Sequence, residues 1–402
     1  MRIARVRARN IGFSRAPTTL KRNLVSSASL LEGFAERPQG WFGPAVCTLV
    51  EIETDDGARG IGSAGALSGA AKGILEGYLA DLVAGQDPRH HEALWQRMYR
   101  PLIRFGRSGA AVAAISAIDI ACWDLHGRTE GRAVADLLGG RTRSSAPCYV
   151  SRCYALEDLE ALAEEAAGYV SEGFDRIKQR FGFGPVDGPA GMVRNRQLVE
   201  TVREAAGPDI ELAADAYMGW DRPYAHEMAV RLQDLGLSWI EEPLLPHDVD
   251  GYADLRSRTP WQRWSAGEHS YTKWDFQELI AKRAVDLLQP DVNRMGGFTE
   301  ARKVCALAEA AGVPVVPHSN EAHNLQLVFS QPPDVCPLVE YFPDVEPDTG
   351  NELFWRLFDG NPRARGGQIE LPAQPGLGIN VDEDVVAELL VEDGRWLPDK
   401  SG

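Results

Sequence analysis

The stretch Leu237-Ser238-Trp239-Ile240-Glu241 is a short apolar run that closes on an acidic residue, and runs of this kind recur along the chain. The residues that close them are Asp215, Glu241, Glu268, Asp291, His318 and Glu340. They follow one another at intervals of about 25 residues, which is the length of one strand, one helix and two loops. A strand–helix unit repeated with a polar residue at each strand end predicts an α/β fold, a parallel (β/α)8-type barrel with its active site at the C-terminal mouth.

The first part of the chain has a different pattern. Residues 1 to about 65 are rich in strand signals, because Thr48–Thr54 alternates apolar and polar residues and Asp55-Asp56-Gly57 predicts the turn of a hairpin. Residues 66–138 have apolar side chains at helical spacing and stop at Gly139-Gly140. This part therefore predicts a smaller α+β unit in front of the barrel.

With 402 residues, the chain is too long for a single core. We expect an N-terminal capping domain at 1–138, the barrel at 139–355, and a tail at 356–402 that returns to the capping domain. A long loop near 17–44 carries Trp41 beside a second aromatic residue. Long loops without secondary structure are uncommon unless they are functional, which favours a lid over the mouth; aromatic packing at an interface is the alternative.

The composition limits the classes of function. A net charge of −16 disfavours nucleic acid and anionic membrane surfaces as partners, although a local cationic or metal site still accepts a small anion. The six cysteines form no CxxC pair and lie mostly in apolar runs, which predicts buried free thiols in a reducing compartment. The N-terminus has no signal-peptide pattern, and Ala110–Leu125 is interrupted by Asp119 and Asp124 and is too short to span a bilayer, so we expect a cytoplasmic protein.

Asp215, Glu241 and Glu268 would end three consecutive strands and point into one mouth. Carboxylates that converge repel one another unless a cation lies between them, and a site made of oxygen ligands suits a hard divalent ion. These three residues therefore predict an Mg²⁺ site. The alternative for each acid alone is a helix N-cap or a solvated loop carboxylate.

Other strand ends carry groups suited to proton transfer. Asp291 and His318 end successive strands, so a hydrogen bond between them would give a general acid/base; a structural core histidine is the alternative. Lys178 and Arg180 share one side of a strand, where the guanidinium and burial would favour a neutral lysine base; two solvated cations are the alternative. Glu340 would donate a hydrogen bond to an anionic substrate oxygen if burial raises its pKa, and a surface glutamate is the alternative.

Several motifs occur together in this chain. They are Ile177-Lys178-Gln179-Arg180, Ile240-Glu241-Glu242-Pro243, Gly267-Glu268-His269, Gln289-Pro290-Asp291 and Val316-Pro317-His318. In combination they resemble the mandelate racemase subgroup of the enolase superfamily over almost the whole chain. The resemblance implies a capping domain built from both termini over a modified barrel, and Mg²⁺ held by Asp215, Glu241 and Glu268. It also implies a His318–Asp291 dyad facing Lys178 across the substrate, and a homo-oligomer, because members of the family are commonly oligomeric.

Within that family, Gly184-Pro185, Asp187-Gly188 and the Gly-Glu-His triplet resemble acid-sugar dehydratases of the rhamnonate type. The resemblance implies an Mg²⁺-dependent hydro-lyase that removes the C2 proton of an aldonate, passes through an ene-diolate and expels the 3-hydroxyl to leave a 2-keto-3-deoxy acid. Arg180 departs from that type. This departure leaves open which acid sugar is used, and whether Lys178 or His318 is the C2 base.

Other functions remain open. A racemase or epimerase uses the same ene-diolate and suits Lys178 and His318 equally well. A relative that only binds metal is disfavoured because the catalytic set is intact, and a hydrolase is disfavoured because the acids are spread too evenly to single out a two-carboxylate pair. His269, Asn293 and Trp41 are the weaker candidates for contacts to a small anionic sugar acid.

Overall fold

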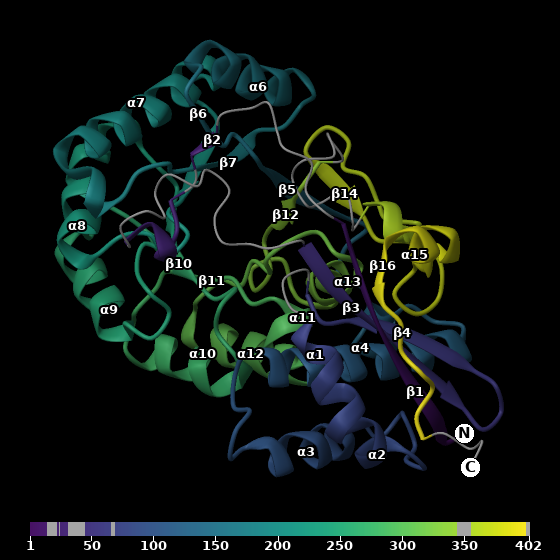
Figure 1. Ribbon diagram of the computed structural model, residues 1–402. Helices are drawn as coiled ribbons and strands as arrows, with labels where there is room; N and C mark the ends of the chain where they lie inside the picture. The colour runs from purple at the N-terminus through teal and green to yellow at the C-terminus, as the bar shows by residue number, and fades with distance from the viewer. Residues whose placement is uncertain (14–21, 24, 31–44, 66–68, 344–354, 399–402) are drawn as a thin grey trace.

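A computed structural model gives the structure of residues 1–13, 22–23, 25–30, 45–65, 69–343 and 355–398. Helices and short parallel strands form a ring, and an antiparallel sheet with its own helices stands beside it (Figure 1). The expected lid near 17–44 lies mostly outside the described ranges, and Trp41 lies outside them altogether.

The ring is a curled parallel sheet. Its strands are β5 (Ser145–Ser151), β7 (Arg176–Arg180), β8 (Glu211–Asp215), β9 (Ile240–Glu241), β10 (Trp264–Ala266), β11 (Leu287–Leu288) and β12 (Val339–Tyr341). Strand β12 pairs in parallel with β5, and Val315 forms a parallel bridge to Leu288 of β11. Val315 also donates its N–H to the carbonyl of Val335, shortly before β12, so this segment fills the position between β11 and β12. The predicted α/β barrel is confirmed.

Helices follow the strands around the outside of the ring (Figure 1). They are α6 (Leu159–Ser171), α7 (Gly188–Ala206), α8 (Arg222–Arg231), α9 (Val249–Arg258), α10 (Thr272–Ala281), α11 (Val292–Met295), α12 (Gly297–Ala311) and α13 (Ala322–Ser330), with short 3-10 turns η3 (Pro185–Asp187) and η4 (Gln233–Leu235). Asp158, Asp221 and Asp248 begin α6, α8 and α9, where their side chains accept backbone N–H groups that have no partner within the helix.

The second part contains a four-stranded antiparallel sheet of order β16-β1-β3-β4. Its strands are β1 (Ile3–Phe13), β3 (Ala45–Thr54), β4 (Arg59–Ser63) and β16 (Leu390–Glu392). The helices beside it are α1 (Ala70–Ile74), the π-helical turn η2 (Leu75–Leu79), α2 (Ala80–Val83), α3 (His91–Leu102), α4 (Ala110–Glu130) and α5 (Val134–Leu137). The predicted hairpin is confirmed, because β3 and β4 pair on either side of Gly57, whose φ is +84°.

Helix α4 joins the two parts and is buried along nearly its whole length. It packs so closely on β4 that a Cβ at Gly60 would lie 2.2 Å from the carbonyl oxygen of Ala121, and one at Gly62 would lie 2.1 Å from that of Ala117. Its 21 residues and its hydropathy are sufficient to cross a membrane, so the expectation that this segment is too short is wrong. Because 89% of its most apolar window is buried inside the protein, α4 has the environment of a core helix.

The C-terminal segment contacts both parts. It contains β13 (Phe358–Asp359), β14 (Gln368–Glu370), β15 (Asn380–Val381), α15 (Glu383–Leu389) and β16. Strand β14 pairs with β5 of the ring, and β16 pairs with β1, beside which Figure 1 draws it. The buried guanidinium of Arg9 in β1 donates to Glu383 at 2.7 and 2.9 Å. The domain boundaries after residues 138 and 355 stay predictions.

A described fragment of the expected lid lies at the C-terminal ends of the ring strands. Strand β2 (Arg22–Asn23) pairs with β6 (Ala155–Leu156), and the turn η1 (Ser27–Leu30) follows it. Between them, Val25 donates its N–H to the carbonyl of Phe181, one residue past β7, at 3.2 Å. This end of the loop is therefore anchored beside the mouth.

The apolar core has a separate layer inside the ring. This layer is a small cluster of Tyr149, Ala213, Trp239, Leu287 and Val316. The six cysteines are buried free thiols, as the sequence predicts.

Candidate active site at the C-terminal mouth of the barrel

Strand pairing brings the predicted polar residues to one end of the ring. Lys178 and Arg180 lie on β7 with both side chains buried, and Arg180, Asp215 and Glu241 are successive register partners across β7, β8 and β9. Because these strands run in the same direction, their C-terminal ends meet at one mouth.

Lys178 lies between two acids. Its Nζ is 2.5 Å from Glu241 Oε1 and 2.7 Å from Glu340 Oε1, and none of these side chains is more than 1% exposed. Glu241 Oε2 accepts hydrogen bonds from Gln289 Nε2 at 2.6 Å and Trp239 Nε1 at 3.3 Å. Buried charges are costly unless they are paired and hydrogen-bonded, so these contacts hold the ammonium and both carboxylates in one geometry.

Arg180 forms a second ion pair at the mouth. Its guanidinium contacts Asp215 Oδ2 and donates to Ser151 Oγ at 3.1 Å. Asp215 Oδ1 accepts the N–H of Tyr217 at 2.7 Å, whereas Oδ2 has no hydrogen bond of ordinary geometry. Tyr217 and Met218 have φ values of +43° and +59°, left-handed conformations that cluster at functional sites.

His318 and Asp291 form the predicted pair. His318 Nδ1 lies 2.8 Å from Asp291 Oδ2, and His318 Nε2 lies 3.3 Å from Glu268 Oε2. Burial acts to lower the pKa of His318, but the charge of Glu268 and the hydrogen bond to Asp291 outweigh burial and raise the pKa to about 9. Arg294 Nε lies 3.3 Å from Asp291 and its Nη1 lies 3.2 Å from Glu268, so the imidazole is surrounded by fixed charges.

Glu340 differs from its prediction. Burial acts to raise its pKa, but the charges of Lys178, His318 and Arg180 outweigh burial and lower the pKa to about 2. Glu340 Oε2 also accepts the N–H of Ser319 at 2.8 Å. The expectation of a raised pKa is therefore wrong, because a buried lysine lies beside this carboxylate.

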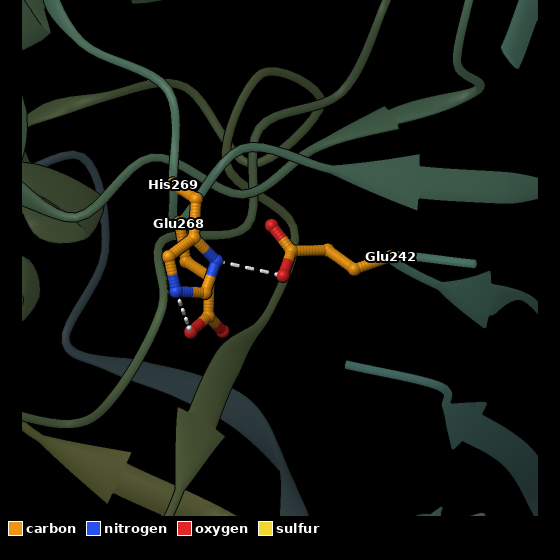
Figure 2. Close-up of side chains that lie close together, drawn as sticks. All are labelled: Glu242, Glu268 and His269. Carbon is orange, nitrogen blue, oxygen red and sulfur yellow. Dashed lines mark hydrogen bonds and ion pairs between the residues drawn. The ribbon is translucent and has the colours of Figure 1, made fainter. Parts of the chain in front are cut away.

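A further acidic group lies next to these residues (Figure 2). His269 Nδ1 is 2.8 Å from Glu242 Oε2, and His269 Nε2 is 3.7 Å from Glu268 Oε1. One ligand atom from each of these three residues lies within 4.8 Å of the others, which is close enough to hold a metal ion. Glu242 has a φ of +39°, a rare conformation for a residue with a Cβ.

The three predicted Mg²⁺ ligands are buried, and each contacts a cationic side chain. Asp215 contacts Arg180, Glu241 contacts Lys178, and Glu268 contacts an arginine and two histidines. Over the ranges that the structure describes, Asp215 and Glu241 belong to no group of three ligand atoms within 4.8 Å, whereas Glu268 does. The oxygen-only donor set of these three carboxylates fits a hard divalent ion. The assignment of all three as ligands stays a prediction.

The two weaker candidates occupy different environments. The side chain of His269 is 19% exposed at the mouth, beside Glu242. Asn293 is 1% exposed, and its Nδ2 donates to Glu321 Oε2 at 2.5 Å, next to Asp291 instead of toward solvent. Their roles as substrate contacts stay predictions.

Three residues of the mouth, Gln289, Arg294 and Asn324, are not among the residues predicted from the sequence. Gln289 is inside the Gln289-Pro290-Asp291 motif, and Arg294 lies at helical i+3 spacing from Asp291, so both had a sequence signal. Asn324 donates to the carbonyl oxygen of His318 at 2.5 Å from the first turn of α13. No spacing rule pointed to it, because the loop between His318 and α13 has no regular period.

Comparison with known proteins identifies relatives along most of the chain. A sequence profile described as "Enolase C-terminal domain-like" matches residues 161–385, and one described as "Mandelate racemase / muconate lactonizing enzyme, N-terminal domain" matches residues 42–139. The chain is 34% identical over 340 residues to L-rhamnonate dehydratase of Saccharopolyspora erythraea, covering 84% of this chain and 83% of that protein. It is 32% identical over 354 residues to D-galactarolactone cycloisomerase of Agrobacterium fabrum, covering 86% of this chain and 91% of that protein.

The fold agrees with these matches. The structure is similar to that of rhamnonate dehydratase from Gibberella zeae complexed with Mg, with a TM-score of 0.86, 30% sequence identity, and coverage of 97% of this chain and 96% of that chain. The N-terminal profile covers most of the capping part, and the C-terminal profile covers most of the ring. The chain therefore belongs to the mandelate racemase/muconate lactonizing enzyme family of the enolase superfamily.

Proposed function

We propose that the protein is an Mg²⁺-dependent acid-sugar dehydratase, a hydro-lyase that acts on an aldonate. The observation that carries the proposal is the arrangement of Lys178 and the His318–Asp291 pair around one buried mouth, with Glu340 between them. Similarity to L-rhamnonate dehydratase over most of the chain supports this reaction class.

Asp215, Glu241 and Glu268 are the residues that would hold Mg²⁺. Bound there, the ion supplies positive charge that offsets the charge developing on the substrate carboxylate. The magnesium complex of the Gibberella zeae enzyme supports this choice of cation. Glu242, Glu268 and His269 form an alternative metal site that shares Glu268 with the proposed one. A nitrogen ligand such as His269 suits transition metals better than Mg²⁺.

Proton transfer falls to Lys178 and His318. Lys178 or His318, in its neutral form, removes the C2 proton of the aldonate, and the adjacent positive charge of Arg180 favours binding of an anionic substrate. Because Asp291 fixes Nδ1 of His318, the other ring nitrogen exchanges protons with the substrate. Protonated His318 then gives its proton to the departing 3-hydroxyl, and the resulting enol ketonises to a 2-keto-3-deoxy acid.

One alternative rests on a specific observation. The similarity to D-galactarolactone cycloisomerase extends over 86% of the chain. An isomerase, whether a cycloisomerase or a racemase, would also employ the two bases Lys178 and His318 in proton transfer. The products separate these functions, because dehydration yields a 2-keto acid and water, whereas isomerisation conserves the composition of the substrate.

The test of the reaction is a screen of purified protein with Mg²⁺ against aldonates and aldarates, read as the semicarbazone absorbance of 2-keto acids. We expect a signal that EDTA abolishes, that Mg²⁺ restores and that His318→Asn removes. His226→Asn, on the outer helix α8, is the matched control and keeps the signal. If no compound of the library yields a 2-keto acid, but one of them exchanges its C2 proton in D₂O, dehydration is overturned in favour of isomerisation.

The test of the metal site is thermal unfolding during an Mg²⁺ titration. We expect Mg²⁺ to stabilise the wild-type protein by about 2.7 kcal/mol at a hundredfold excess over Kd. Glu241→Gln should remove this stabilisation, whereas Glu242→Gln, the adjacent residue, should keep it. The reverse pattern would move the metal to the group of Glu242, Glu268 and His269.

A further inference from the structure

The side of Asp291 opposite His318 carries a buried polar group of its own. It consists of Asn293 in α11, Glu321 before α13 and His323 in α13. We propose that Glu321 and His323 are positioning residues, which hold Asp291 in the orientation that binds His318 Nδ1. The catalytic consequence rests on the function proposed above, whereas the structural consequence does not.

The two oxygens of Asp291 face two histidines, one in hydrogen-bond contact and one at ion-pair distance. Oδ2 lies 2.8 Å from Nδ1 of His318, and Oδ1 lies 3.7 Å from Nε2 of His323. The side chains of Asp291 and His323 are 2% and 5% exposed, so bulk water does not replace either partner. One carboxylate thus lies between an imidazole at the mouth and an imidazole behind it.

His323 is held in turn by Glu321. Glu321 Oε2 lies 2.9 Å from His323 Nε2, and it accepts a hydrogen bond from Asn293 Nδ2 at 2.5 Å. The N–H of Glu321 donates to Ser319 Oγ at 3.4 Å. Nε2 of His323 thus lies between two carboxylates and pairs with both by charge, without a hydrogen bond of ordinary geometry to either.

Other groups also contact Asp291. Arg294 approaches Oδ2 at 3.3 Å, the oxygen that His318 already binds. Asn324 Nδ2 reaches Oδ1 at 3.4 Å but makes a shorter hydrogen bond, 2.5 Å, to the carbonyl of His318. The backbone N–H of Asn293 donates to Oδ1 at 3.2 Å and carries no formal charge. Two neutral donors therefore hydrogen-bond Oδ1, and the ion pair with His323 adds charge on the same side of Asp291, which favours leaving Oδ2 for His318.

The group lies where the capping part meets the ring. A cavity of about 10 Å³ adjoins Glu321 and His323, and its other walls come from β4 and the C-terminal segment, including Ser63 and Leu377. A space of this size holds no more than one water molecule. The fit of the capping part against the ring therefore bears on the orientation of Asp291.

The test follows the His318 ring proton in ¹⁵N-histidine-labelled full-length protein. The Nδ1–H resonance of His318 is assigned by its loss in His318→Asn. We expect His323→Phe and Glu321→Gln to shift this resonance and to speed its exchange with water. The matched control is His91→Phe, which removes a partly buried histidine stacked on Trp123 at 3.7 Å between ring centroids, and it should leave the resonance unchanged.

Kinetics give the catalytic readout. His323→Phe and Glu321→Gln should each lower kcat about 10–100-fold. KM should change little, because neither residue contacts the predicted metal ligands. His323→Gln, whose amide is polar and can donate to Asp291, should recover part of the loss. A purely structural role would instead lower stability and leave kcat per folded molecule unchanged.

Two results overturn the proposal. One is a His318 resonance that stays unchanged in both His323→Phe and Glu321→Gln, whatever reaction the protein catalyses. The other is a kcat that equals the wild-type value in both variants, once the wild-type enzyme has a measurable activity. If His323→Phe does not fold, Glu321→Gln and His323→Gln carry the comparison. A failed substrate screen overturns the proposed dehydration alone, since the resonance still decides the positioning role.

Discussion

Buried acids occur in two regions of the molecule, and the two sets have different partners. At the mouth, Glu340 and Asp291 each face several cationic side chains, which outweigh the effect of burial and hold the pKa of each below its usual value, whereas burial and two neighbouring carboxylates keep the pKa of Glu241 raised. In helix α4, Asp119 and Asp124 are equally buried, but there burial dominates and raises both pKa values, that of Asp119 to about 7.

The acids of α4 bind mainly backbone and hydroxyl donors. Asp124 accepts the N–H groups of Ile61 at 2.9 Å and Leu377 at 2.8 Å, and it pairs with Arg128 at 2.7 Å. These contacts tie α4 to β4 and to the C-terminal segment. The comparison teaches that burial alone does not mark a catalytic acid, since buried acids also serve as structural ties. The number of cationic side chains around the carboxylate separates Glu340 and Asp291 from the acids of α4.

The largest expected effect is at the mouth. Asp291→Asn keeps the size of the side chain but cannot stabilise an imidazolium by charge, so we expect kcat per folded molecule to fall by about 10²–10⁴-fold, in addition to a loss of stability from the buried charges left unpaired. Steady-state production of 2-keto acid and thermal unfolding measure the two effects. A variant that keeps most of its activity would contradict the role of Asp291 and remove the contrast between the regions.

The acids of α4 should respond in the opposite way. Asp124→Ala leaves the N–H groups of Ile61 and Leu377 without their acceptor, whereas Arg128 keeps the carbonyl of Ile379, so we expect the free energy of unfolding to fall by about 1–3 kcal/mol for each unsatisfied N–H group. The kcat per folded molecule should not change. Glu130→Ala, at the exposed end of the same helix, should cost less than about 0.5 kcal/mol. Denaturant unfolding measures both, and a loss of activity without a loss of stability would assign Asp124 to the site.

Sequence reasoning succeeds where a pattern is periodic. The recurring strand ends predict the ring, because an apolar run before each polar residue is visible without knowing any partner, and parallel pairing then makes Asp215 and Glu241 neighbours. It fails where the answer depends on a partner distant in sequence. The pKa of Glu340 is lowered because Lys178 lies beside it, and Asp119 does not interrupt α4 because Thr299 of another helix binds it.

Glu340 offers a sharper test within the mouth. An ionised Glu340 compensates the charge of Lys178, and glutamine cannot, so Glu340→Gln should lower kcat by about 10–100-fold. A neutral carboxylic acid that only donates a hydrogen bond would be replaced well by the amide, which also donates. Kinetics near neutral pH therefore distinguish the two roles, and nearly full activity of the variant would restore the neutral-acid interpretation.

The smallest expected effect concerns the pH dependence of stability. The pKa of Asp119 is raised from 3.8 to about 7, chiefly by burial. The folded protein keeps this proton up to about pH 7, whereas the unfolded chain releases it near pH 4. The folded state thus binds more protons in this window, and the stabilising contribution is complete below about pH 4 and is lost progressively toward pH 7. Glu340 has the opposite sign, because its pKa is lowered from 4.5 to about 2 and its contribution is lost as the pH falls through that interval.

Asp119→Asn should therefore reduce the loss of stability between pH 4 and pH 7 by an amount on the order of 1–3 kcal/mol. Glu340→Gln should leave that interval unchanged and should flatten the curve only below about pH 4.5, where the wild-type carboxylate takes up its proton. The free energy of unfolding from denaturant titrations between pH 3 and pH 8 measures both. If Asp119→Asn followed the wild-type curve throughout, Asp119 would be ionised in the folded protein. The hydroxyl and the backbone N–H of Thr299 would then stabilise a buried, ionised carboxylate as well as Lys178 does at the mouth. The partners of a buried acid would in that case no longer separate a structural acid from a catalytic one.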